Sequence, residues 1–489
     1  MRYFHRISLI LTIGILAMSL IACEPPKPVT TAPSSGASYT FERGYPSGDV
    51  QKANDDNAFS RAVQAYHFWY PTVSNEGIFQ GFRDVGVRDN EAIGVANAGP
   101  RQVAFTANAD TPYGVAVLDL SQGPWVIEMP PGPFIGLVDD HNQSWILDMG
   151  IPGPNAGKGG KHLIVGPGYK GPIPSGYQVG HSDTNKLLVA VRALPVGGDV
   201  AKANAALRFI KFHPLGQDTK SIKYVDTSQM KMDSTCLRWE DNFQFWQVLK
   251  KIVDEEPVDL KFPIMYSYLA TLGIEKGKAF NPDDKMKSLL ERAAKTARDQ
   301  MLVSAFASNR PDKMAWPDRK WEWAGLVPNQ AAFETAMGPD IEARDRWFIQ
   351  AIVTSPAMFR RTEGAGSLYW LGVRDSSGAY LDGGKSYKLT VPLPVPDKLF
   401  WSVTLYDTVT RSMIQTDQDK SALRSLFELK DKTGSSVDLY FGPTAPPSHE
   451  NEWIKTTPGK GWFAYFRIYG PEPPTFNGSW KPGDFEEVK

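Results

Sequence analysis

Residues Trp125 to Gly150 read WVIEMPPGPFIGLVDDHNQSWILDMG, and they contain three short segments rich in β-branched and aromatic residues. Gly and Pro turns separate these segments, which is the pattern of strands joined by tight connections. The same pattern extends outward on both sides, from Val103 to Leu194. The sequence therefore predicts an antiparallel β domain in this part of the chain.

A second stretch, residues Tyr387 to Asp417, repeats this arrangement as YKLTVPLPVPDKLFWSVTLYDTVTRSMIQTD. In both stretches one strand ends in a Pro turn, the next two each end in Asp, and a later strand runs into Gly-Pro. The aspartates are Asp139 and Asp148 in the first stretch, and Asp407 and Asp417 in the second. We predict a mostly β protein with α-helices, in which a helical region joins two related antiparallel β-sandwich domains of jelly-roll-like form.

Between the two β regions, apolar residues recur at helical spacing, most clearly from Asp283 to Ala307. The predicted organisation is a lipoprotein signal peptide at 1–22, a flexible tether at 23–45, an N-terminal β-sandwich domain at 46–215, a helical middle region at 216–365 and a C-terminal β-sandwich domain at 366–489.

The first residues of the chain predict where in the cell the protein is located. A basic start is followed by the apolar run from Ile7 to Ile21 and by Leu-Ile-Ala before Cys23. This pattern resembles a bacterial lipobox, in which the cysteine becomes the new N-terminus and carries acyl chains. Glu24 follows it, and by resemblance to Gram-negative lipoproteins this favours an outer-membrane lipoprotein facing the periplasm. The alternative is an uncleaved N-terminal anchor helix.

Composition excludes several classes of protein. The chain has 53 Lys and Arg against 54 Asp and Glu, and this balance argues against nucleic acid as a partner. It has no phosphate-binding loop that opens a helix, no Gly-x-Ser-x-Gly elbow and no pair of histidines at metal-ligand spacing. The sequence therefore predicts no cofactor and no metal site.

The first candidate site is in FTANADTPYGVAVLDL, residues Phe105 to Leu120. An amide, a carboxylate, a hydroxyl and a phenol fall within six positions, on Asn108, Asp110, Thr111 and Tyr113. At the end of a strand these groups are placed to bind a polyol or a carboxylate. The alternative is that Asn and Asp bond their own backbone in a turn.

A second candidate is DDHNQSW, where Asp139, Asp140 and His141 follow one another. Adjacent residues of a strand point to opposite faces, so at most one carboxylate shares a pocket with His141. A His beside an Asp can act as a base. The alternative is that the group completes a turn between strands.

The third candidate is in the second β region and comprises Tyr406, Asp407 and Arg411. An arginine can hold a carboxylate through two hydrogen bonds. The alternative is an Arg–Asp pair that links two strands.

The motifs NADTPYGVAVLDLSQGPWVIEMP, KHLIVGPGYKGPIPSGY and GGKSYKLTVPLPVPDKLFWSVTLYD resemble a bacterial protein family of two parts. Its parts are the domains of unknown function 1254 (N-terminal) and 1214 (C-terminal). The resemblance covers nearly all of the chain after Cys23 and implies a pair of β-sandwich domains with helical additions. The family's Asn-x-Asp-Thr-x-Tyr motif falls on Asn108, Asp110, Thr111 and Tyr113. It supplies no substrate, cofactor or catalytic residue.

Three functions remain open. The first is a lipid-anchored periplasmic protein that binds a small polar or saccharide-like ligand around Asn108, Asp110 and Tyr113. The second is an enzyme that needs no nucleotide, with Asp110 or His141 as base and Tyr113 as acid. The third is a structural or assembly protein of the envelope. The membrane anchor is the expected membrane contact, and a homo-oligomer stays open.

Overall fold

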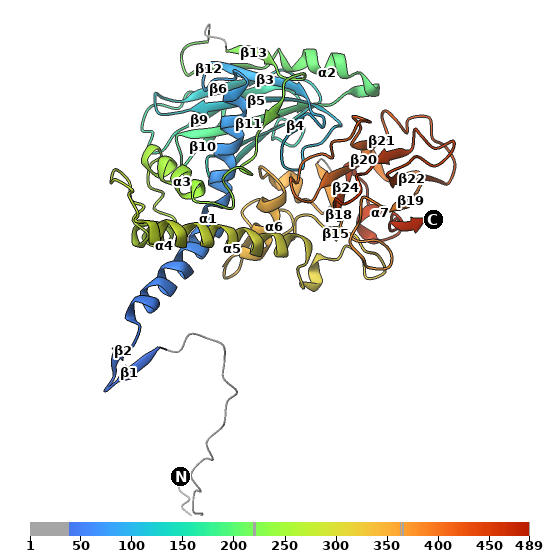
Figure 1. The fold of residues 1–489 in the computed structure, drawn as a ribbon. Helices are drawn as coiled ribbons and strands as arrows, with labels where there is room; N and C mark the ends of the chain where they lie inside the picture. Colours follow the sequence, from blue (N-terminus) through green and yellow to red (C-terminus); the bar gives the residue numbers. More distant parts are fainter. Residues whose placement is uncertain (1–38, 219–221, 362, 364–365, 489) are drawn as a thin grey trace, which may run out of the picture. The chain divides into compact units, whose positions relative to one another are not determined.

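The computed structural model describes residues 39–218, 222–361, 363 and 366–488, and the chain divides into two compact units, Met1–Ala53 and Asn54–Lys489. The predicted signal peptide, Cys23 and the first part of the predicted tether lie outside the described residues. In the first unit, strands β1 (Thr40–Glu42) and β2 (Tyr45–Ser47) form an antiparallel hairpin (Figure 1). No helix of the described residues combines the length and apolar character needed to cross a membrane.

The N-terminal sandwich consists of a six-stranded sheet, in the order β13-β3-β5-β11-β7-β8, and a four-stranded sheet, in the order β10-β9-β6-β12. Its strands are β3 (Ala92–Asn97), β5 (Pro112–Asp119), β6 (Trp125–Met129), β7 (Phe134–Asp140), β8 (Trp145–Gly150), β9 (Gly160–Val165), β10 (Tyr177–His181), β11 (Lys186–Ala193), β12 (Lys211–Pro214) and β13 (Lys223–Asp226). Apolar side chains from both sheets fill the space between them.

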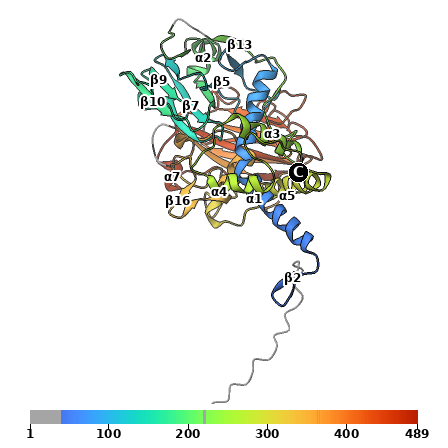
Figure 2. The same cartoon turned by 90° about the vertical axis from the view of Figure 1, so that its left-hand side faces the viewer.

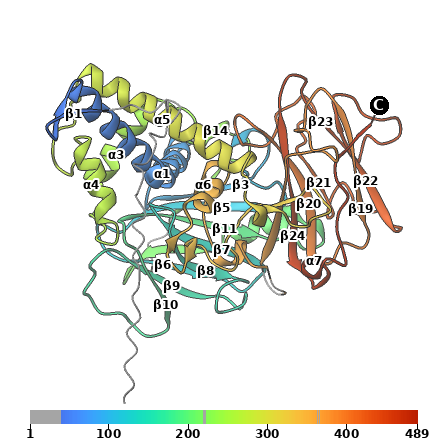
Figure 3. The ribbon, with the colours of Figure 1, turned by 90° about the horizontal axis from the view of Figure 1, so that it is seen from below.

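The C-terminal sandwich has a five-stranded sheet, in the order β15-β18-β24-β20-β21, and a four-stranded sheet, in the order β23-β22-β19-β25. Its strands are β15 (Glu322–Trp323), β18 (Ser367–Gly372), β19 (Ser386–Pro392), β20 (Asp397–Asp407), β21 (Ala422–Arg424), β22 (Ser436–Gly442), β23 (Trp453–Lys455), β24 (Trp462–Pro471) and β25 (Glu486–Val488). Figure 3 shows these strands, in orange and red, beside those of the first sandwich.

The two sandwiches share one topology. The order β3-β5-β11-β7-β8 corresponds strand by strand to β15-β18-β24-β20-β21, and β10-β9-β6-β12 corresponds to β23-β22-β19-β25. The parallel pair within each four-stranded sheet is repeated as well, because β10 pairs with β9 in parallel and β23 pairs with β22 in parallel. The prediction of two related β-sandwiches in a mostly β protein is confirmed.

One predicted strand is wrong. The segment SMIQT, residues 412–416, forms only an isolated bridge between Met413 and Tyr406. The edge position beside β20 is taken instead by β21, ten residues further along. Asp417 therefore lies in a loop and does not end a strand.

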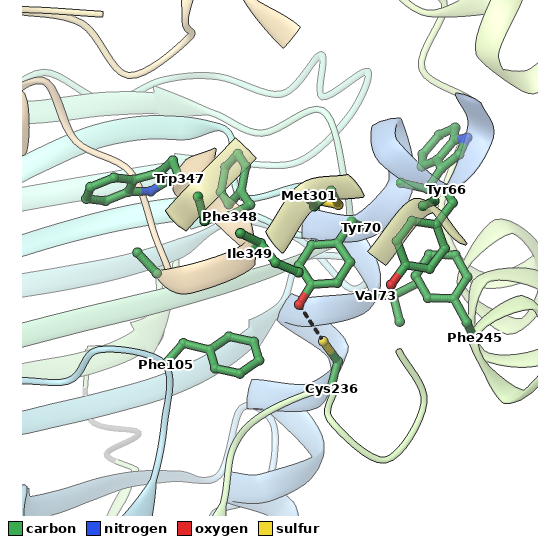
Figure 4. Packing of buried hydrophobic residues seen from close by; sticks show 14 of the residues in the cluster. Tyr66, Tyr70, Val73, Phe105, Cys236, Phe245, Met301, Trp347, Phe348 and Ile349 are labelled. Carbon is green, nitrogen blue, oxygen red and sulfur yellow. Dashed lines mark hydrogen bonds between the residues drawn. The ribbon is translucent and has the colours of Figure 1, made fainter. Parts of the chain in front are cut away.

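The helices are α1 (Val50–Asp84), α2 (Val200–Leu207), α3 (Gln244–Glu255), α4 (Pro263–Thr271), α5 (Asp284–Phe306), α6 (Ile341–Gln350) and α7 (Pro474–Asn477), and further short strands are β4 (Gln102–Val103), β14 (Met232–Asp233), β16 (Glu334–Thr335) and β17 (Gly338–Pro339). Helix α1 packs along the first sandwich through Ile78, Phe79 and Phe82 (Figure 2). A large apolar cluster joins α1, α3, α5 and α6 to the second sandwich, and Figure 4 shows Tyr66, Tyr70 and Trp347 within it.

Alternate residues of the central strands face opposite sides of each large sheet. On β11, the side chains of Leu187, Val189 and Val191 are buried inside the first sandwich. Ala190 and Arg192 lie on the outer face of the sheet. On β24, Tyr465 and Arg467 likewise face out of the second sandwich. The outer faces of the two large sheets therefore contribute side chains to the same region between the sandwiches.

Candidate functional site

A cavity of about 170 Å³ lies between the two large sheets. The first sandwich contributes residues of β5, β7 and β11 to its wall, and the second contributes residues of β18 and β24. Trp347 of α6 and the segment that follows this helix line it as well, together with Ile78 and Phe82 of α1. Most of the lining is apolar, so a polar side chain on this wall is conspicuous.

The most prominent polar residues are two cross-strand Tyr–Arg pairs. Tyr113 of β5 lies opposite Arg192 of β11, and Tyr369 of β18 lies opposite Arg467 of β24. These strand pairs occupy equivalent places in the two sheets. All four residues line the cavity. The duplicated topology therefore brings the same pair of side chains to the cavity twice, once from each sandwich.

Arg467 is buried, with 3% of its surface exposed. Its Nη2 donates a hydrogen bond of 2.7 Å to the carbonyl oxygen of Thr106. The guanidinium carbon lies 4.9, 5.5 and 5.6 Å from the ring centres of Tyr465, Tyr406 and Tyr369. Burial raises the pKa of Tyr406 and of Tyr465, so both phenols stay protonated at neutral pH. The Nη1 group of Arg467 has no hydrogen-bond partner among the described residues.

Arg192 approaches the cavity from the first sandwich. Its Nη1 donates a hydrogen bond of 3.1 Å to the hydroxyl of Tyr469, whose ring centre is 5.5 Å from the guanidinium carbon. Arg192 and Arg467 both interact electrostatically with Tyr369 and Tyr469. The two cations therefore lie near the same two tyrosines, of which Tyr369 lines the cavity.

Arg192, Tyr369 and Arg467 are not among the candidate site residues that the sequence motifs indicate. A signal for the two arginines was present, since each one follows a run of five apolar or aromatic residues within a central strand, in KLLVAVRA and WFAYFRIYGP. No local signal indicates that the two strands face each other.

Only part of the motif that begins at Asn108 lies on the cavity wall. Asn108 and Tyr113 line the cavity, whereas Asp110 and Thr111 do not. Asn108 Oδ1 accepts hydrogen bonds from the backbone N–H groups of Asp110, at 2.9 Å, and Thr111, at 3.3 Å. The amide oxygen therefore closes its own turn, as the alternative interpretation of this motif supposed.

The same stretch forms the contact between the sandwiches. Asp110 Oδ2 accepts a hydrogen bond of 2.9 Å from the Ser402 hydroxyl. Arg424 and Tyr406 donate hydrogen bonds of 2.6 Å to the carbonyl oxygens of Ala109 and Ala107. Burial raises the pKa of Asp110, and nearby arginines oppose that shift.

His141 lies away from the cavity lining and is fully buried. Its Nδ1 is 2.9 Å from Glu256 Oε1, and its Nε2 is 3.5 Å from Glu76 Oε2. Asp140 does not bond the ring and instead accepts hydrogen bonds from the backbone N–H groups of Asn142 and Ser144. Burial raises the pKa of Asp140 to about 7. The imidazole therefore links the turn after β7 to α1 and to the end of α3.

The residues of the third candidate, Tyr406, Asp407 and Arg411, also have partners other than those that the sequence suggested. Arg411 Nη2 lies 2.6 Å from Glu240 Oε2, so the predicted Arg–Asp pair is replaced by an Arg–Glu pair. Asp407 Oδ1 accepts hydrogen bonds from the backbone N–H groups of Val409 and Thr410. Asp407 thus closes the turn after β20 just as Asp140 closes the turn after β7. Pairing with β24 and β11 makes these two aspartates equivalent, rather than Asp407 and Asp139.

The stability of the protein is expected to depend on pH through Asp139, whose carboxyl group is fully buried. Burial raises its pKa far above the usual value, and the nearby Asp140 and Asp148 add to the shift, whereas a hydrogen bond from the Thr354 N–H opposes it. A carboxyl whose pKa is higher in the folded state makes the protein less stable as the pH rises above about 4. We expect Asp139→Asn to gain stability over the native protein as pH rises, by at most about 1.4 kcal/mol per pH unit.

Urea unfolding from pH 4 to pH 8 measures this difference. Asp431→Asn, at an exposed position, is the control and should show no such trend. A constant difference between Asp139→Asn and the native protein at all pH values would contradict the expectation.

Among the side chains that the structure describes, no group of three or more His, Cys, Asp or Glu is arranged to hold a metal ion.

Family models match both sandwiches. Residues 91–214 match "Protein of unknown function (DUF1254)", and residues 366–473 match "Protein of unknown function (DUF1214)". The chain carries this pair of domains. Their order is the one that the sequence motifs indicated, which confirms the resemblance. The DUF1254 match includes Tyr113 and Arg192, and the DUF1214 match includes Tyr369 and Arg467.

Solved structures that match the chain include the following two. The VPA0106 protein from Vibrio parahaemolyticus is 17% identical with a TM-score of 0.54, and the alignment covers 88% of this chain and 100% of that one, which shows a shared fold. An uncharacterised protein from Burkholderia cenocepacia is 11% identical with a TM-score of 0.40, covering 90% of this chain and 97% of that one. No curated protein matches the chain significantly.

Proposed function

We propose that this protein binds a small, largely apolar molecule in the cavity between its DUF1254 and DUF1214 domains. The observation that carries the proposal is the cavity itself, which has about 170 Å³ of space and a mostly apolar wall. Apolar cavities of about 150 Å³ are known to stay dry and to bind ligands such as benzene. Sites between domains with a few polar groups on an apolar wall are also typical of ligand binding.

The lining favours an apolar ligand over the saccharide-like one expected from the sequence. A sugar presents hydroxyl groups on most sides, and each buried hydroxyl needs a hydrogen-bond partner. Alanine, isoleucine, leucine and valine side chains supply much of this wall, among them Ile135, Leu137 and Leu188. They can surround a hydrocarbon body but cannot satisfy a ring of hydroxyls.

The lipid anchor is a separate part of the proposal. We propose acylation of Cys23 and attachment to the outer membrane on the basis of the lipobox-like sequence that precedes it. Labelling of growing cells with radioactive palmitate is expected to mark the native protein and to leave Cys23→Ser unlabelled. Label retained on Cys23→Ser would refute the assignment.

Titration calorimetry with 1-octanol and D-glucose tests the cavity. Ala190 lines the cavity from β11, so Ala190→Phe would fill part of it. We expect 1-octanol to bind the native protein with one site and a negative heat-capacity change, and Ala190→Phe to weaken it about tenfold or more. D-glucose is expected not to bind.

Ala201→Phe, at an exposed position of α2, is the matched control and should bind 1-octanol as the native protein does. Equal affinity in a folded Ala190→Phe variant would contradict the proposal. Failure of both 1-octanol and octanoate to bind the native protein would contradict it as well.

A further inference from the structure

Three buried arginines can be compared within this chain. Arg346 and Arg411 are fully buried, and each pairs with a glutamate, at 2.7 Å with Glu322 and at 2.6 Å with Glu240. Arg467 is nearly as buried, yet its described partners are a carbonyl oxygen and tyrosine rings. A buried charge is strongly unfavourable unless an opposite charge compensates it. The wall of the cavity therefore holds a cation that lacks the partner given to the other two.

The unpartnered part of Arg467 belongs to a residue of the cavity wall. Its Nη1 is buried and has no hydrogen-bond partner in the part of the chain that the structure describes, while the residue lines the cavity. The tyrosine rings around it attract the cation but do not neutralise it. Among the described residues, Arg467 Nη1 therefore lacks a hydrogen-bond acceptor, and a ligand in the cavity can supply one.

Arg192 adds a second cation from the other sandwich, at the equivalent strand position. Asp110 is the carboxylate that interacts electrostatically with both arginines, and it is hydrogen-bonded to Ser402. Asp148 also lines the cavity, and the Ser355 hydroxyl and the Trp145 indole N–H bond its two oxygens. The arginine that acts on Asp148 is Arg360 rather than Arg192 or Arg467. A carboxylate bound beside Arg192 and Arg467 therefore supplies the second negative charge, in addition to that of Asp110.

We infer that the ligand of the proposed function is a monocarboxylate, whose carboxylate binds between Arg192 and Arg467 and whose apolar body fills the cavity. This inference rests on the proposed function. A guanidinium presents parallel N–H donors that match the two oxygens of a carboxylate. The mostly apolar wall then receives the rest of the molecule.

Titration calorimetry with octanoate, 1-octanol and octyl phosphate tests the inference, because the three have alkyl chains of nearly equal length and differ mainly in the head group. We expect octanoate to bind the native protein about tenfold or more tightly than 1-octanol, and more tightly than octyl phosphate. Arg467→Gln and Arg192→Gln are expected to weaken octanoate about tenfold or more, and to leave 1-octanol within about twofold.

Two variants are needed because each arginine donates a hydrogen bond across the sandwiches, Arg467 to the Thr106 carbonyl oxygen and Arg192 to the Tyr469 hydroxyl. Loss of either bond can unfold the protein, so the variant that stays folded decides the result. Arg208→Gln, at an arginine 42% exposed beyond α2, is the control for loss of charge. Equal affinity for octanoate and 1-octanol would overturn the carboxylate site and leave the proposed function standing. Tighter binding of octyl phosphate would overturn it in favour of a dianion. Absence of binding by all three would overturn the proposed function itself.

Discussion

Glu240→Ala is expected to destabilise the protein by about 3–5 kcal/mol, because it leaves a buried guanidinium without its counterion. Glu240 and Arg411 are both almost completely buried, and 2.6 Å separates Glu240 Oε2 from Arg411 Nη2. The same oxygen accepts a hydrogen bond from the Tyr70 hydroxyl, and the other oxygen accepts one from Arg298. The Nε and Nη1 groups of Arg411 have no hydrogen-bond partner among the described residues, so none of these residues replaces the lost charge.

Urea unfolding, followed by tryptophan fluorescence, measures this effect. Glu275→Ala is the control, because its ion pair with Lys278 is exposed and is expected to contribute less than about 1 kcal/mol. The double variant Glu240→Leu/Arg411→Met should recover much of the loss, since it removes both charges together. A loss below about 1 kcal/mol for Glu240→Ala would show that solvent reaches Arg411.

The architecture was predictable because its signals are local. Strands such as β6, β7 and β9 are short, β-branched and bounded by Gly or Pro, and the structure has them where the pattern indicated. The relation between the two sandwiches was visible in the sequence because a Pro turn, two Asp residues and a Gly-Pro pair recur in the same order in both. It extends further than the sequence indicated, since the correspondence includes the parallel pairs of β9 with β10 and β22 with β23.

Helix α1 shows why part of the fold was missed. Between Ala62 and Phe82 its residues are buried on nearly all sides, including Thr72, Ser74 and Asn75. A helix enclosed on every side has no apolar stripe to contrast with a polar one, so the spacing test has nothing to detect. Pro71 inside the helix also argued against it from sequence alone.

The site was predictable only in part, for a different reason. The local groups at Asn108, Asp140 and Asp407 were found, but each satisfies its own turn. The partners of His141 are Glu76 and Glu256, which are far from it in sequence. Pairing between Tyr369 and Arg467 depends on strand register, and no local pattern encodes that register.

Trp347→Ala is expected to destabilise the protein by about 3–5 kcal/mol and to change which ligands fit. Trp347 of α6, labelled in Figure 4, is 1% exposed. It also lines the cavity. Its indole N–H donates a hydrogen bond of 3.0 Å to the carbonyl oxygen of Val353, and its ring centre is 4.6 Å from that of Phe359. Removing the ring therefore takes away packing on the helix side and leaves the Val353 carbonyl without this donor.

The same substitution extends the cavity, because the space left by the indole opens onto it. Longer apolar chains should then gain affinity relative to shorter ones, and bound ligand should recover part of the lost stability by mass action. Urea unfolding measures the first effect, with Phe209→Ala as the control because Phe209 is 70% exposed. Calorimetry with hexanoate, octanoate and dodecanoate measures the second. An unchanged order of affinities in a folded Trp347→Ala variant would place the ligand elsewhere, since a chain held in this cavity must respond to the loss of one of its walls.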